Sequence, residues 1–457
     1  MLSIKEIVTN TNGKLINGKE EKSISSFKID SRLIEKGDFF IPINGEKVNG
    51  HDFIIDCVNH GVVGFFIEKD FKNKENVINE SINLNKNICI IEVENSENAL
   101  KDLATYNRIK HINIPIVAVT GSVGKTSTRQ IVASVLSKEK NILVTEKNYN
   151  SNIGMPLMLL KLENQDAAVL EVGIDEVGQM TELSEIIKPD IAIITIIGTA
   201  HIGRIGSREK IYEEKIKITD YIQGEKIVIL NNDNEYLNGL SSNKYKIKRI
   251  ALSDVNNINE ENRLEFITNI YNNNEKITLN VNGIHNIYNA LFAIRVGEIF
   301  NIKKENILKG LEEYKNYSRR FEVINIGNDI KIIDDTYNAN YDSMKSGLEC
   351  ANSLNAKRKI AVLGDMLDLG KYSEKLHRNV GMLFKNLNFN YLYVIGDNAK
   401  YIADEAKKYM NEEKIKVYND KALLINGIKL EMTKGDLIYF KASNGMKFNE
   451  IIKKLTK

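Results

Sequence analysis

One segment constrains the fold of this chain most. A β-branched run, Ile116–Thr120, enters a turn with two glycines, and a helix-compatible stretch follows directly. This order places free backbone N–H groups and a helix N-terminus where a phosphate can bind. The Lys125 ammonium can reach the terminal phosphates, and the Thr126 hydroxyl can bind the accompanying Mg²⁺. We therefore predict a nucleoside triphosphate site made by Gly121, Ser122, Val123, Gly124, Lys125, Thr126 and Ser127.

The turn departs in one position from the general P-loop pattern, G-x-x-x-x-G-K-[ST]. The first glycine of that pattern would fall where the chain has Val119, so only the shorter G-x-x-G-K-T is present, from Gly121 to Thr126. On this segment alone, an ordinary strand–turn–helix with a surface lysine stays open as the alternative.

Composition narrows the class of protein. The 457 residues suggest about three domains. The net charge is +2, so nothing indicates a nucleic acid or an anionic membrane as a partner. The N-terminus carries charges inside any apolar segment, and the longest apolar run, Ile191–Ile197, is too short to span a bilayer. We expect a cytoplasmic protein with no integral membrane segment and no nucleic-acid partner.

The apolar runs predict an α/β fold in three parts. Residues 1–112 are expected to form a small α/β domain. Residues 113–316 alternate near-continuous apolar strands with helices, which is typical of a doubly wound parallel sheet. Residues 317–457 repeat that alternation and predict a Rossmann-like domain. Asn-Asn pairs around residues 231, 256 and 272 predict loops.

Two polar residues follow strands of the middle part, at the sheet edge where ligands of parallel sheets bind. Glu171 ends a predicted strand and is a candidate ligand for the nucleotide's Mg²⁺, with a solvated strand cap as the alternative. His201 follows the run Ile191–Ile197, and an ordinary hydrogen-bonded histidine is its alternative.

Other candidates are ambiguous on their own. Lys215 lies on the apolar stripe of a predicted amphipathic helix, where a snorkelling lysine is the simpler explanation. The string Asp-Asp-Thr-Tyr-Asn-Ala-Asn at 334–340 suits ribose hydroxyls or a substrate amine, although an Asx-rich turn has the same composition. Asn286 and Asn289 are about one helical turn apart and can either bind a base edge or cap a helix.

Taken together, these motifs resemble the Mur ligases, the ATP-dependent amide-forming enzymes of peptidoglycan synthesis. The resemblance runs nearly end to end, and the family's own loop is the short G-x-x-G-K-[ST] form. Residues 30–32, 37–46 and 50–53 look like its UDP-sugar-binding segment. The string at 334–340 is most similar to members that join D-alanyl-D-alanine to a UDP-N-acetylmuramoyl-tripeptide. Further matching segments are 148–154, 200–201, 206–207, 363–370 and 435–436.

The resemblance implies a catalytic set of Lys125, Glu171, His201, Lys215 and Arg320. Thr126 and Glu171 would bind one Mg²⁺. His201 and Lys215, the latter carrying a carbamate, would bind a second. Carbamylation turns a cation into an anion, which would account for a lysine that faces inward.

The resemblance also implies contacts to the other ligands. Asn289 would contact adenine, Asp335 the ribose, and Arg320 the γ-phosphate from the third domain. The implied reaction phosphorylates the tripeptide with ATP, and the amine of D-Ala-D-Ala then attacks the acyl phosphate. A monomer is expected. The substrate contacts would come from Ser31, Arg32, Gly45, His51, Asn150, Asn152, Tyr337, Asn338 and Asn340.

The chain differs from the family pattern at several positions. Arg319 stands where the family usually has glycine, Tyr341 where it has proline, and Lys217 where it has an acidic residue. The family string K-G-S-R appears as Lys-Ala-Ser-Asn. Asn444 therefore stands where the family has an arginine, near the expected dipeptide end of the site. This last change bears on acceptor binding more than on ATP chemistry.

Two alternatives stay open. One is another ligase of the superfamily, which would add a single amino acid, or glutamates to folate. The other is a nucleotide-dependent binding or scaffold protein with a decayed site, against which the joint presence of Lys125, Glu171, His201 and Lys215 argues. The sequence does not identify the third residue of the tripeptide.

Overall fold

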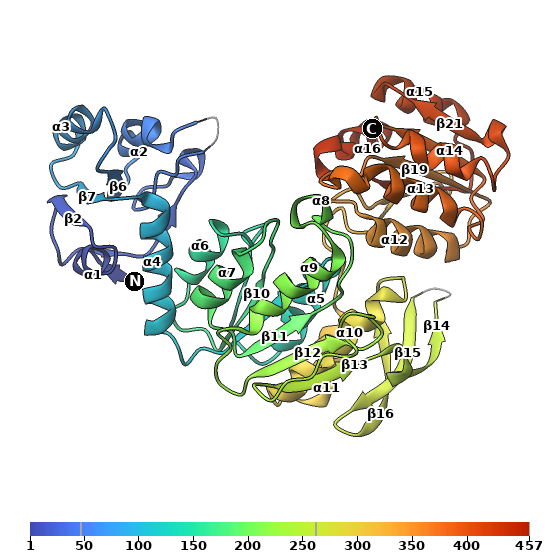
Figure 1. The fold of residues 1–457 in the computed structure, drawn as a ribbon, viewed down its shortest axis with the longest axis horizontal. Coiled ribbons are helices and arrows are strands. Elements are labelled where there is room, and N and C mark those ends of the chain that lie inside the picture. Colours follow the sequence, from blue (N-terminus) through green and yellow to red (C-terminus); the bar gives the residue numbers. More distant parts are fainter. Residues whose placement is uncertain (46–47, 261–262, 457) are drawn as a thin grey trace.

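The computed structural model describes residues 1–45, 48–260 and 263–456, so Glu46 of the segment 37–46 lies outside the described residues. Figure 1 shows an N-terminal lobe (blue), a central lobe (green to yellow) and a C-terminal lobe (orange to red). The outer two lobes stand apart on the same side of the central one. Each lobe contains a sheet flanked by helices, which confirms the predicted three-domain α/β fold.

The N-terminal lobe is built on a mixed sheet in the order β2-β7-β6-β5-β4. Its strands are β2 (Lys14–Asn17), β4 (Phe27–Lys28), β5 (Phe39–Phe40), β6 (Gly64–Glu68) and β7 (Cys89–Val93). β1 (Leu2–Ser3) and β3 (Ser23–Ile24) form a separate pair, and the helices are α1 (Ile4–Asn10), α2 (Ile54–Asn59), α3 (Lys74–Leu84) and α4 (Ser96–Lys110). β5 is short because Pro42, which has no N–H to donate, follows it closely.

The central sheet is parallel throughout, in the order β13-β12-β11-β8-β10-β9. β8 lies between β10 and β11, so the chain crosses from one side of β8 to the other at the point where such sheets bind ligands. The strands are β8 (Ile116–Thr120), β9 (Ile142–Val144), β10 (Ala167–Glu171), β11 (Ile191–Ile194), β12 (Ile227–Asn231) and β13 (Lys246–Ile250). The helices are α5 (Lys125–Leu136), α6 (Gly154–Leu159), α7 (Gln179–Ile187), α8 (Ile202–Ile205), α9 (Arg208–Ile216), α10 (His285–Ile299) and α11 (Lys304–Glu312).

An antiparallel sheet, β14 (Val255–Asn259), β15 (Leu264–Ile270) and β16 (Asn273–Leu279), follows the central sheet. The loop predicted at the Asn pair near residue 256 is wrong, because Asn256 and Asn257 belong to β14. Leu264, Phe266 and Ile270 alternate toward the core, and burial on one face outweighs the poor strand propensity of asparagine.

The C-terminal lobe has a six-stranded sheet in the order β17-β18-β22-β19-β20-β21, parallel except for the edge strand β17. The strands are β17 (Glu322–Asn325), β18 (Lys331–Asp334), β19 (Arg358–Gly364), β20 (Tyr391–Ile395), β21 (Ile415–Tyr418) and β22 (Asp436–Lys441). The helices are α12 (Tyr341–Ser353), α13 (Ser373–Leu383), α14 (Lys400–Ala406), α15 (Lys421–Glu431) and α16 (Phe448–Leu455).

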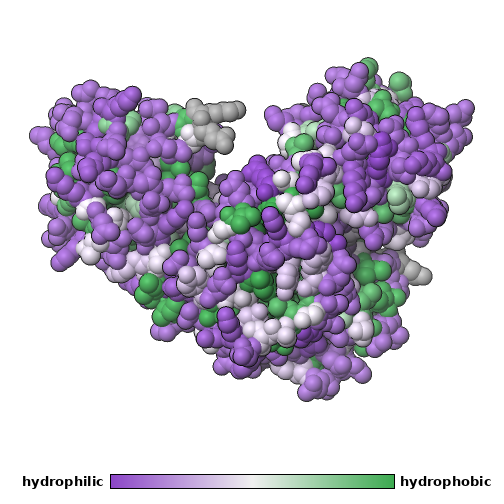
Figure 2. All heavy atoms as spheres, viewed as in Figure 1, coloured by the Kyte–Doolittle hydropathy of each residue, from purple (hydrophilic) through white to green (hydrophobic). Residues whose placement is uncertain are grey.

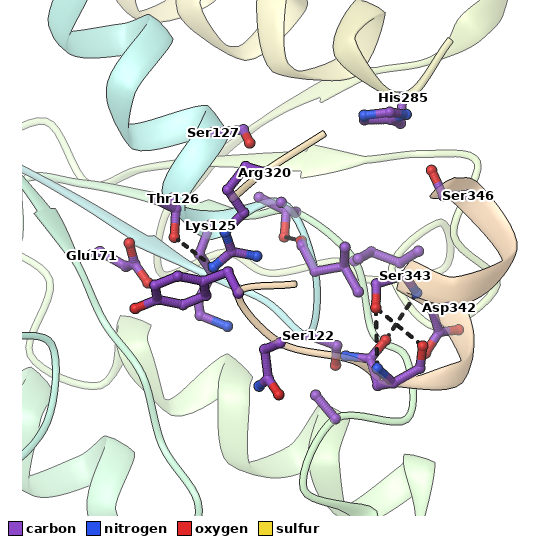
Figure 3. Close-up of a pocket in the computed structure, with 18 of the residues that line it drawn as sticks. Ser122, Lys125, Thr126, Ser127, Glu171, His285, Arg320, Asp342, Ser343 and Ser346 are labelled. Atoms are coloured by element: carbon purple, nitrogen blue, oxygen red, sulfur yellow. Dashed lines mark hydrogen bonds between the residues drawn. The ribbon is translucent and has the colours of Figure 1, made fainter. Parts of the chain in front are cut away.

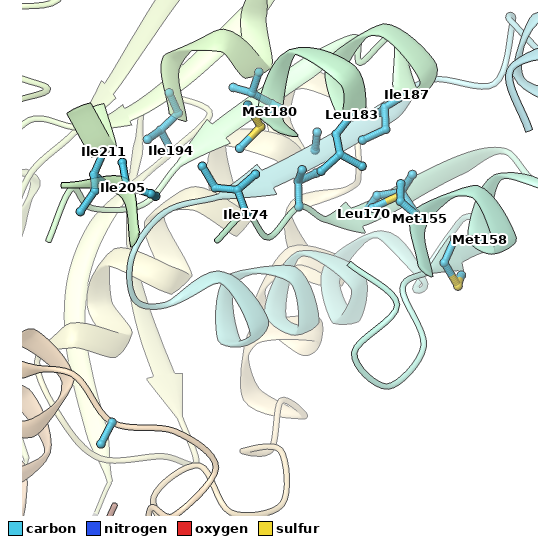
Figure 4. Close-up of a cluster of buried hydrophobic side chains, with 14 of the residues drawn as sticks. Met155, Met158, Leu170, Ile174, Met180, Leu183, Ile187, Ile194, Ile205 and Ile211 are labelled. Atoms are coloured by element: carbon cyan, nitrogen blue, oxygen red, sulfur yellow. The ribbon is translucent and has the colours of Figure 1, made fainter. Parts of the chain in front are cut away.

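A dense apolar cluster fixes the edge of the central sheet that carries the candidate site. Met155 and Met158 of α6, Leu170 of β10 and Met180 of α7 pack there with Ile194 of β11 (Figure 4). All five are fully buried, and burial of each such side chain stabilises the fold by about 1.5–3 kcal/mol. The strands that end in Glu171 and precede His201 are therefore held rigidly against these helices.

Figure 2 shows a surface hollowed between the N-terminal and C-terminal lobes, with hydrophilic residues on most of the visible face. No helix among the described residues is both long enough and apolar enough to cross a membrane. The carboxyl ends of the central strands face the C-terminal lobe, which places β18 and α12 opposite the glycine turn.

Candidate active site

The turn between β8 and α5 depends on two glycines with positive φ, Gly121 (+146°) and Gly124 (+88°). A Cβ on Gly121 would lie 1.9 Å from Thr195 Oγ1, so only glycine fits there. Gly124 is the N-cap of α5 and has no side chain to cap it, which leaves the first N–H groups of the helix open to an anion. Lys125 Nζ donates to Gly121 O at 2.8 Å and lines a cavity, so it is not a surface lysine.

A cavity of about 470 Å³ opens over this turn. Its walls come from the glycine turn, the loops after β10 and β11, α10, and the segment that runs from Asn316 to Gly347 (Figure 3). Of the predicted site residues, the cavity brings together Ser122, Val123, Gly124, Lys125, Thr126, Ser127, Asn150, Glu171, His201, Asn289, Arg320, Asp335, Tyr337, Asn338 and Asn340.

Glu171 ends β10 beside Lys125, and it is buried rather than solvated. Its Oε1 accepts from Asn150 Nδ2 at 2.8 Å, and its Oε2 lies 3.4 Å from Arg129 Nη1. Arg129, on α5, is 1% exposed, and burial lowers its pKa. The strand-cap alternative therefore does not hold, because this carboxylate is desolvated and faces two cations.

His201 and Lys215 lie close to Lys125 in a buried, cationic environment. His201 has a left-handed backbone (φ +60°), and its buried Nδ1 has no hydrogen-bond partner among the described residues. Burial, with smaller contributions from Lys125 and Lys215, lowers its pKa to about 4. Lys215 on α9 is 1% exposed, so it does not snorkel, and burial followed by Lys125 lowers its pKa well below the usual range.

The C-terminal lobe contacts the start of α5 and the loop after β11. Arg320 Nη2 donates to Thr126 Oγ1 at 3.3 Å, and its guanidinium lies 4.0 Å from the centroid of the Tyr337 ring. Asp342 Oδ2, at the start of α12, accepts from the backbone N–H and hydroxyl of Thr199 at 2.6 and 2.7 Å. Both contacts join the predicted phosphate site to the third lobe.

The residues expected at the nucleoside already have protein partners. Asn289 Oδ1 accepts from Thr128 Oγ1, and Asn289 Nδ2 donates to Asn286 Oδ1, both at 2.8 Å, which leaves one amide hydrogen for a ligand. α10 begins at His285 with Ile284 as its N-cap, so Asn286 does not cap the helix. Asp335 Oδ2 accepts from Lys441 Nζ at 2.6 Å and from the Tyr439 hydroxyl at 3.0 Å.

Several predicted substrate residues do not line this cavity. Arg32 forms two 2.8 Å hydrogen bonds with Asp30 in the N-terminal lobe. His51 is buried, its Nδ1 contacts Asn49 Oδ1 at 2.8 Å, and its Nε2 accepts from Glu68 N at 3.1 Å. Ser31, Gly45 and Asn152 also lie outside the cavity, as do Gly121 and Lys215. Substrate roles for these residues stay predictions.

Sequence reasoning missed four residues at the site, Arg129, His285, Asp342 and Lys441. Arg129 lies one helical turn after Lys125, so helical spacing was an available signal for it. His285 and Lys441 line the cavity and lie close to Asp335. Asp342 contacts Thr199 across 143 residues of sequence, and no local pattern indicates that contact.

His285 gives a prediction for stability. Burial, with a smaller contribution from Lys441, lowers its pKa from 6.5 to about 4, against the opposing effect of Asp335. Between these values the unfolded chain binds a proton that the folded protein does not, so stability falls as pH decreases from about 6.5 toward 4. At pH 5 the loss is about 2 kcal/mol. We expect Tm to fall between pH 7.5 and pH 5 by a few degrees more in the wild type than in His285→Gln. Equal decreases of Tm in the wild type and in His285→Gln would contradict the low pKa of His285.

Oxygen donors at the site fit a nucleotide-bound Mg²⁺. Thr126 and Glu171 line the cavity beside Lys125, and Mg²⁺ in such sites takes few protein ligands, with phosphates and water completing the shell. The described residues contain no group of three or more His, Cys, Asp or Glu placed to hold a metal ion. A second ion beside His201 would therefore need a further anionic ligand.

Two cations that line the cavity, Lys125 and Arg320, form no ion pair among the described residues. Of the other charged groups, Glu171 is paired with Arg129, and Asp335 with Lys441. A bound triphosphate would supply the anion that Lys125 and Arg320 lack, and the open N-terminus of α5 points at the same place. The site is thus suited to binding a nucleoside triphosphate and to stabilising charge on a transferred phosphoryl group.

Comparison with known proteins agrees with this arrangement. Family models match residues 23–108 (Mur ligase family, catalytic domain), 119–297 (Mur ligase middle domain) and 319–444 (Mur ligase, glutamate ligase domain). The UDP-N-acetylmuramoyl-tripeptide–D-alanyl-D-alanine ligase of Bacillus subtilis is 33% identical, over 99% of this chain and 98% of the relative. The Synechocystis ligase of the same name is 30% identical, over 96% of this chain and 93% of the relative. A crystal structure of MurF from Acinetobacter baumannii has a TM-score of 0.86 at 26% identity, over 99% and 98% of the two chains. The chain therefore belongs to the Mur ligase family.

Proposed function

We propose that this protein joins D-alanyl-D-alanine to a UDP-N-acetylmuramoyl-tripeptide at the expense of ATP. The observation that carries the proposal is the match to the Bacillus subtilis ligase of that activity, which spans 99% of the chain and so includes all three lobes. The phosphate site, the two unpaired cations Lys125 and Arg320, and the contact from the third lobe support the same chemistry.

The proposal divides the ligands among the three parts of the chain. Residues 1–112 bind the UDP-sugar, residues 113–316 bind the triphosphate, and residues 317–457 bind the ribose, the γ-phosphate and the dipeptide. A hollow separates the outer lobes, so a long substrate can extend from one lobe to the other. Action in the cytoplasm as a monomer belongs to the same proposal.

The reaction proceeds in two displacements. A tripeptide carboxylate oxygen attacks the γ-phosphorus of ATP, the bond to the β–γ bridging oxygen breaks, and ADP leaves. The free amine of D-Ala-D-Ala then attacks the acyl carbon, and a tetrahedral intermediate expels phosphate while the nitrogen loses a proton. Lys125 and Arg320 stabilise charge on the transferred phosphoryl group. Mg²⁺ held by Thr126 and Glu171 supplies charge neutralisation of the phosphates when bound.

A carbamate on Lys215 completes the site beside His201 in this proposal. The lowered pKa of Lys215 favours the neutral amine, which is the form that adds to CO₂. The product is an anion next to Lys125, where the free ammonium would face another cation. The carbamate also provides the anionic ligand that a second Mg²⁺ beside His201 lacks.

Approach of the third lobe protects the acyl phosphate from water. Arg320 reaches Thr126, and Asp342 accepts two hydrogen bonds from Thr199. Both contacts depend on the position of the C-terminal lobe, so opening of that lobe withdraws Arg320 from the phosphate site. Phosphoryl transfer is thereby coupled to exclusion of water.

The proposed function predicts a strict substrate requirement. Phosphate release from ATP is expected only when UDP-MurNAc-tripeptide and D-Ala-D-Ala are both present, because each displacement needs its own nucleophile. A coupled phosphate assay over a panel of tripeptides measures this and identifies the third residue. Turnover with L-Ala in place of the dipeptide would favour a ligase for single amino acids. ATP binding without turnover on any muramyl substrate would favour a non-catalytic protein.

A further inference from the structure

Arg319 adopts a costly backbone conformation next to the site. Its φ is +63°, in the left-handed region that disfavours side chains, and Phe321 two residues later has φ +55°. Such strain, on the order of 1–3 kcal/mol, persists where surrounding contacts hold it, and it is concentrated at functional sites. Arg320, which contacts Thr126, lies between these two residues.

Three hydrogen bonds fix the Arg319 guanidinium. Its Nε donates to Thr336 Oγ1 at 3.2 Å, and its Nη2 donates to Thr336 O and, at 3.0 Å, to Asn444 Oδ1. The donors on Nη1 have no hydrogen-bond partner within the described part of the chain. The group is therefore oriented by two of its nitrogens and presents the third to solvent or to a ligand.

Arg319 differs from Lys441 and Arg129, which have carboxylate partners. Lys441 pairs with Asp335 at 2.6 Å, and Arg129 lies 3.4 Å from Glu171. Arg320 reaches the phosphate site through Thr126. Arg319 forms no ion pair among the described residues, although its charge lowers the pKa of buried Asp334, against the larger raising effect of burial.

Arg319 lies within reach of a dipeptide that begins beside Arg320. Its guanidinium carbon lies 6.0 Å from the centroid of the Tyr337 ring, which lines the cavity, and the Arg320 guanidinium carbon lies 4.0 Å from the same centroid. The two guanidinium carbons are therefore at most 10.0 Å apart. A dipeptide spans about 7 Å, so an acceptor with its amine beside Arg320 can place its far end near Arg319.

We propose that Arg319 binds the terminal carboxylate of the acceptor dipeptide, with Asn444 and Thr336 orienting its guanidinium. The inference rests on the proposed function, which supplies an acceptor with a free carboxylate. Arg319 stands at a position where the resembling family has glycine, and it contacts Asn444, where that family has arginine.

Removal of either the cation or the carboxylate tests this contact. In the wild type, kcat/KM for D-Ala-D-Ala is expected to exceed that for its C-terminal carboxamide by about 10–100-fold, the effect of a charge-assisted hydrogen bond. Arg319→Gly is expected to remove that preference, with little change in KM for ATP or UDP-MurNAc-tripeptide. Glycine suits the left-handed backbone, so this variant is expected to fold. Adding Asn444→Arg to Arg319→Gly should restore much of the preference.

Lys226→Gly is the matched control. Lys226 also has a positive φ (+50°) and is exposed, but it precedes β12 at the opposite end of the sheet. The Lys226→Gly variant should keep the wild-type preference for D-Ala-D-Ala over its C-terminal carboxamide. If Arg319→Gly keeps that preference while the wild type uses D-Ala-D-Ala, the inference is wrong and the proposed function stands. If the wild type does not use D-Ala-D-Ala at all, both are wrong.

Discussion

Lys125→Met is expected to lower kcat by about 10³-fold or more while the protein stays folded. Preorganised cations at a transferred phosphoryl group are worth several kcal/mol, because charge on that group develops in the transition state. Lys125 lies beside Glu171 and Arg320, and its Nζ reaches back to Gly121 O at 2.8 Å. Methionine keeps the length of the stem, so the turn and α5 should keep their structure.

Steady-state kinetics and nucleotide-binding measurements separate the effect of Lys125→Met on kcat from its effect on the affinity for ATP. The loss in kcat should exceed the loss in affinity for ATP, because only the transition state needs the full charge. Lys140→Met is the control, since Lys140 follows the far end of α5, and it should behave as wild type. A kcat near the wild-type value in Lys125→Met would show that the glycine turn does not serve phosphoryl transfer.

The sequence predicted the nucleotide half of the site well because that half is local. Near-continuous apolar runs identified β8, β10 and β11, and parallel strands bring their carboxyl ends to one edge. Glu171 and His201 could be placed there from strand ends alone. The structure also shows why Lys215 on the apolar stripe of α9 is not a snorkelling lysine, since helix periodicity indicates the face but not the depth of burial.

The closing lobe was not predictable in the same way. The contact of Asp342 with Thr199 spans 143 residues, and that of Arg319 with Asn444 spans 125. The first contact depends on how two lobes are placed and the second on how the C-terminal lobe folds, and local periodicity encodes neither. In the N-terminal lobe, His51 has a motif-like setting and uses both ring nitrogens inside its own lobe, so its substrate role stays a prediction.

The antiparallel sheet was missed because asparagine masked its pattern. β14 and the start of β16 are rich in asparagine, which favours turns. Leu264, Phe266 and Ile270 nevertheless alternate along β15, and this period of two was the available signal. Cross-strand burial, rather than intrinsic propensity, determines this sheet.

Lys215→Ala is expected to lower kcat by at least about 10²-fold, and added bicarbonate should not restore it. The proposed carbamate is the anionic ligand of a metal beside His201, and its removal leaves the neighbouring cations uncompensated. Lys215→Met preserves more of the buried volume and should show the same loss, which separates chemistry from packing. Lys210→Ala, on the exposed face of α9, is the control and should remain active.

CO₂ dependence distinguishes a carbamate from a simple amine. Wild-type protein kept in CO₂-depleted buffer should lose activity and regain it with bicarbonate, because the adduct forms reversibly on the neutral amine. The lowered pKa of Lys215 provides that amine near neutral pH, where an exposed lysine would be almost fully protonated. Protein incubated with ¹³C-bicarbonate should show a carbamate carbon signal that Lys215→Met lacks. Normal turnover in both Lys215 variants would contradict the proposed carbamate, and with it the anionic ligand proposed for the site beside His201.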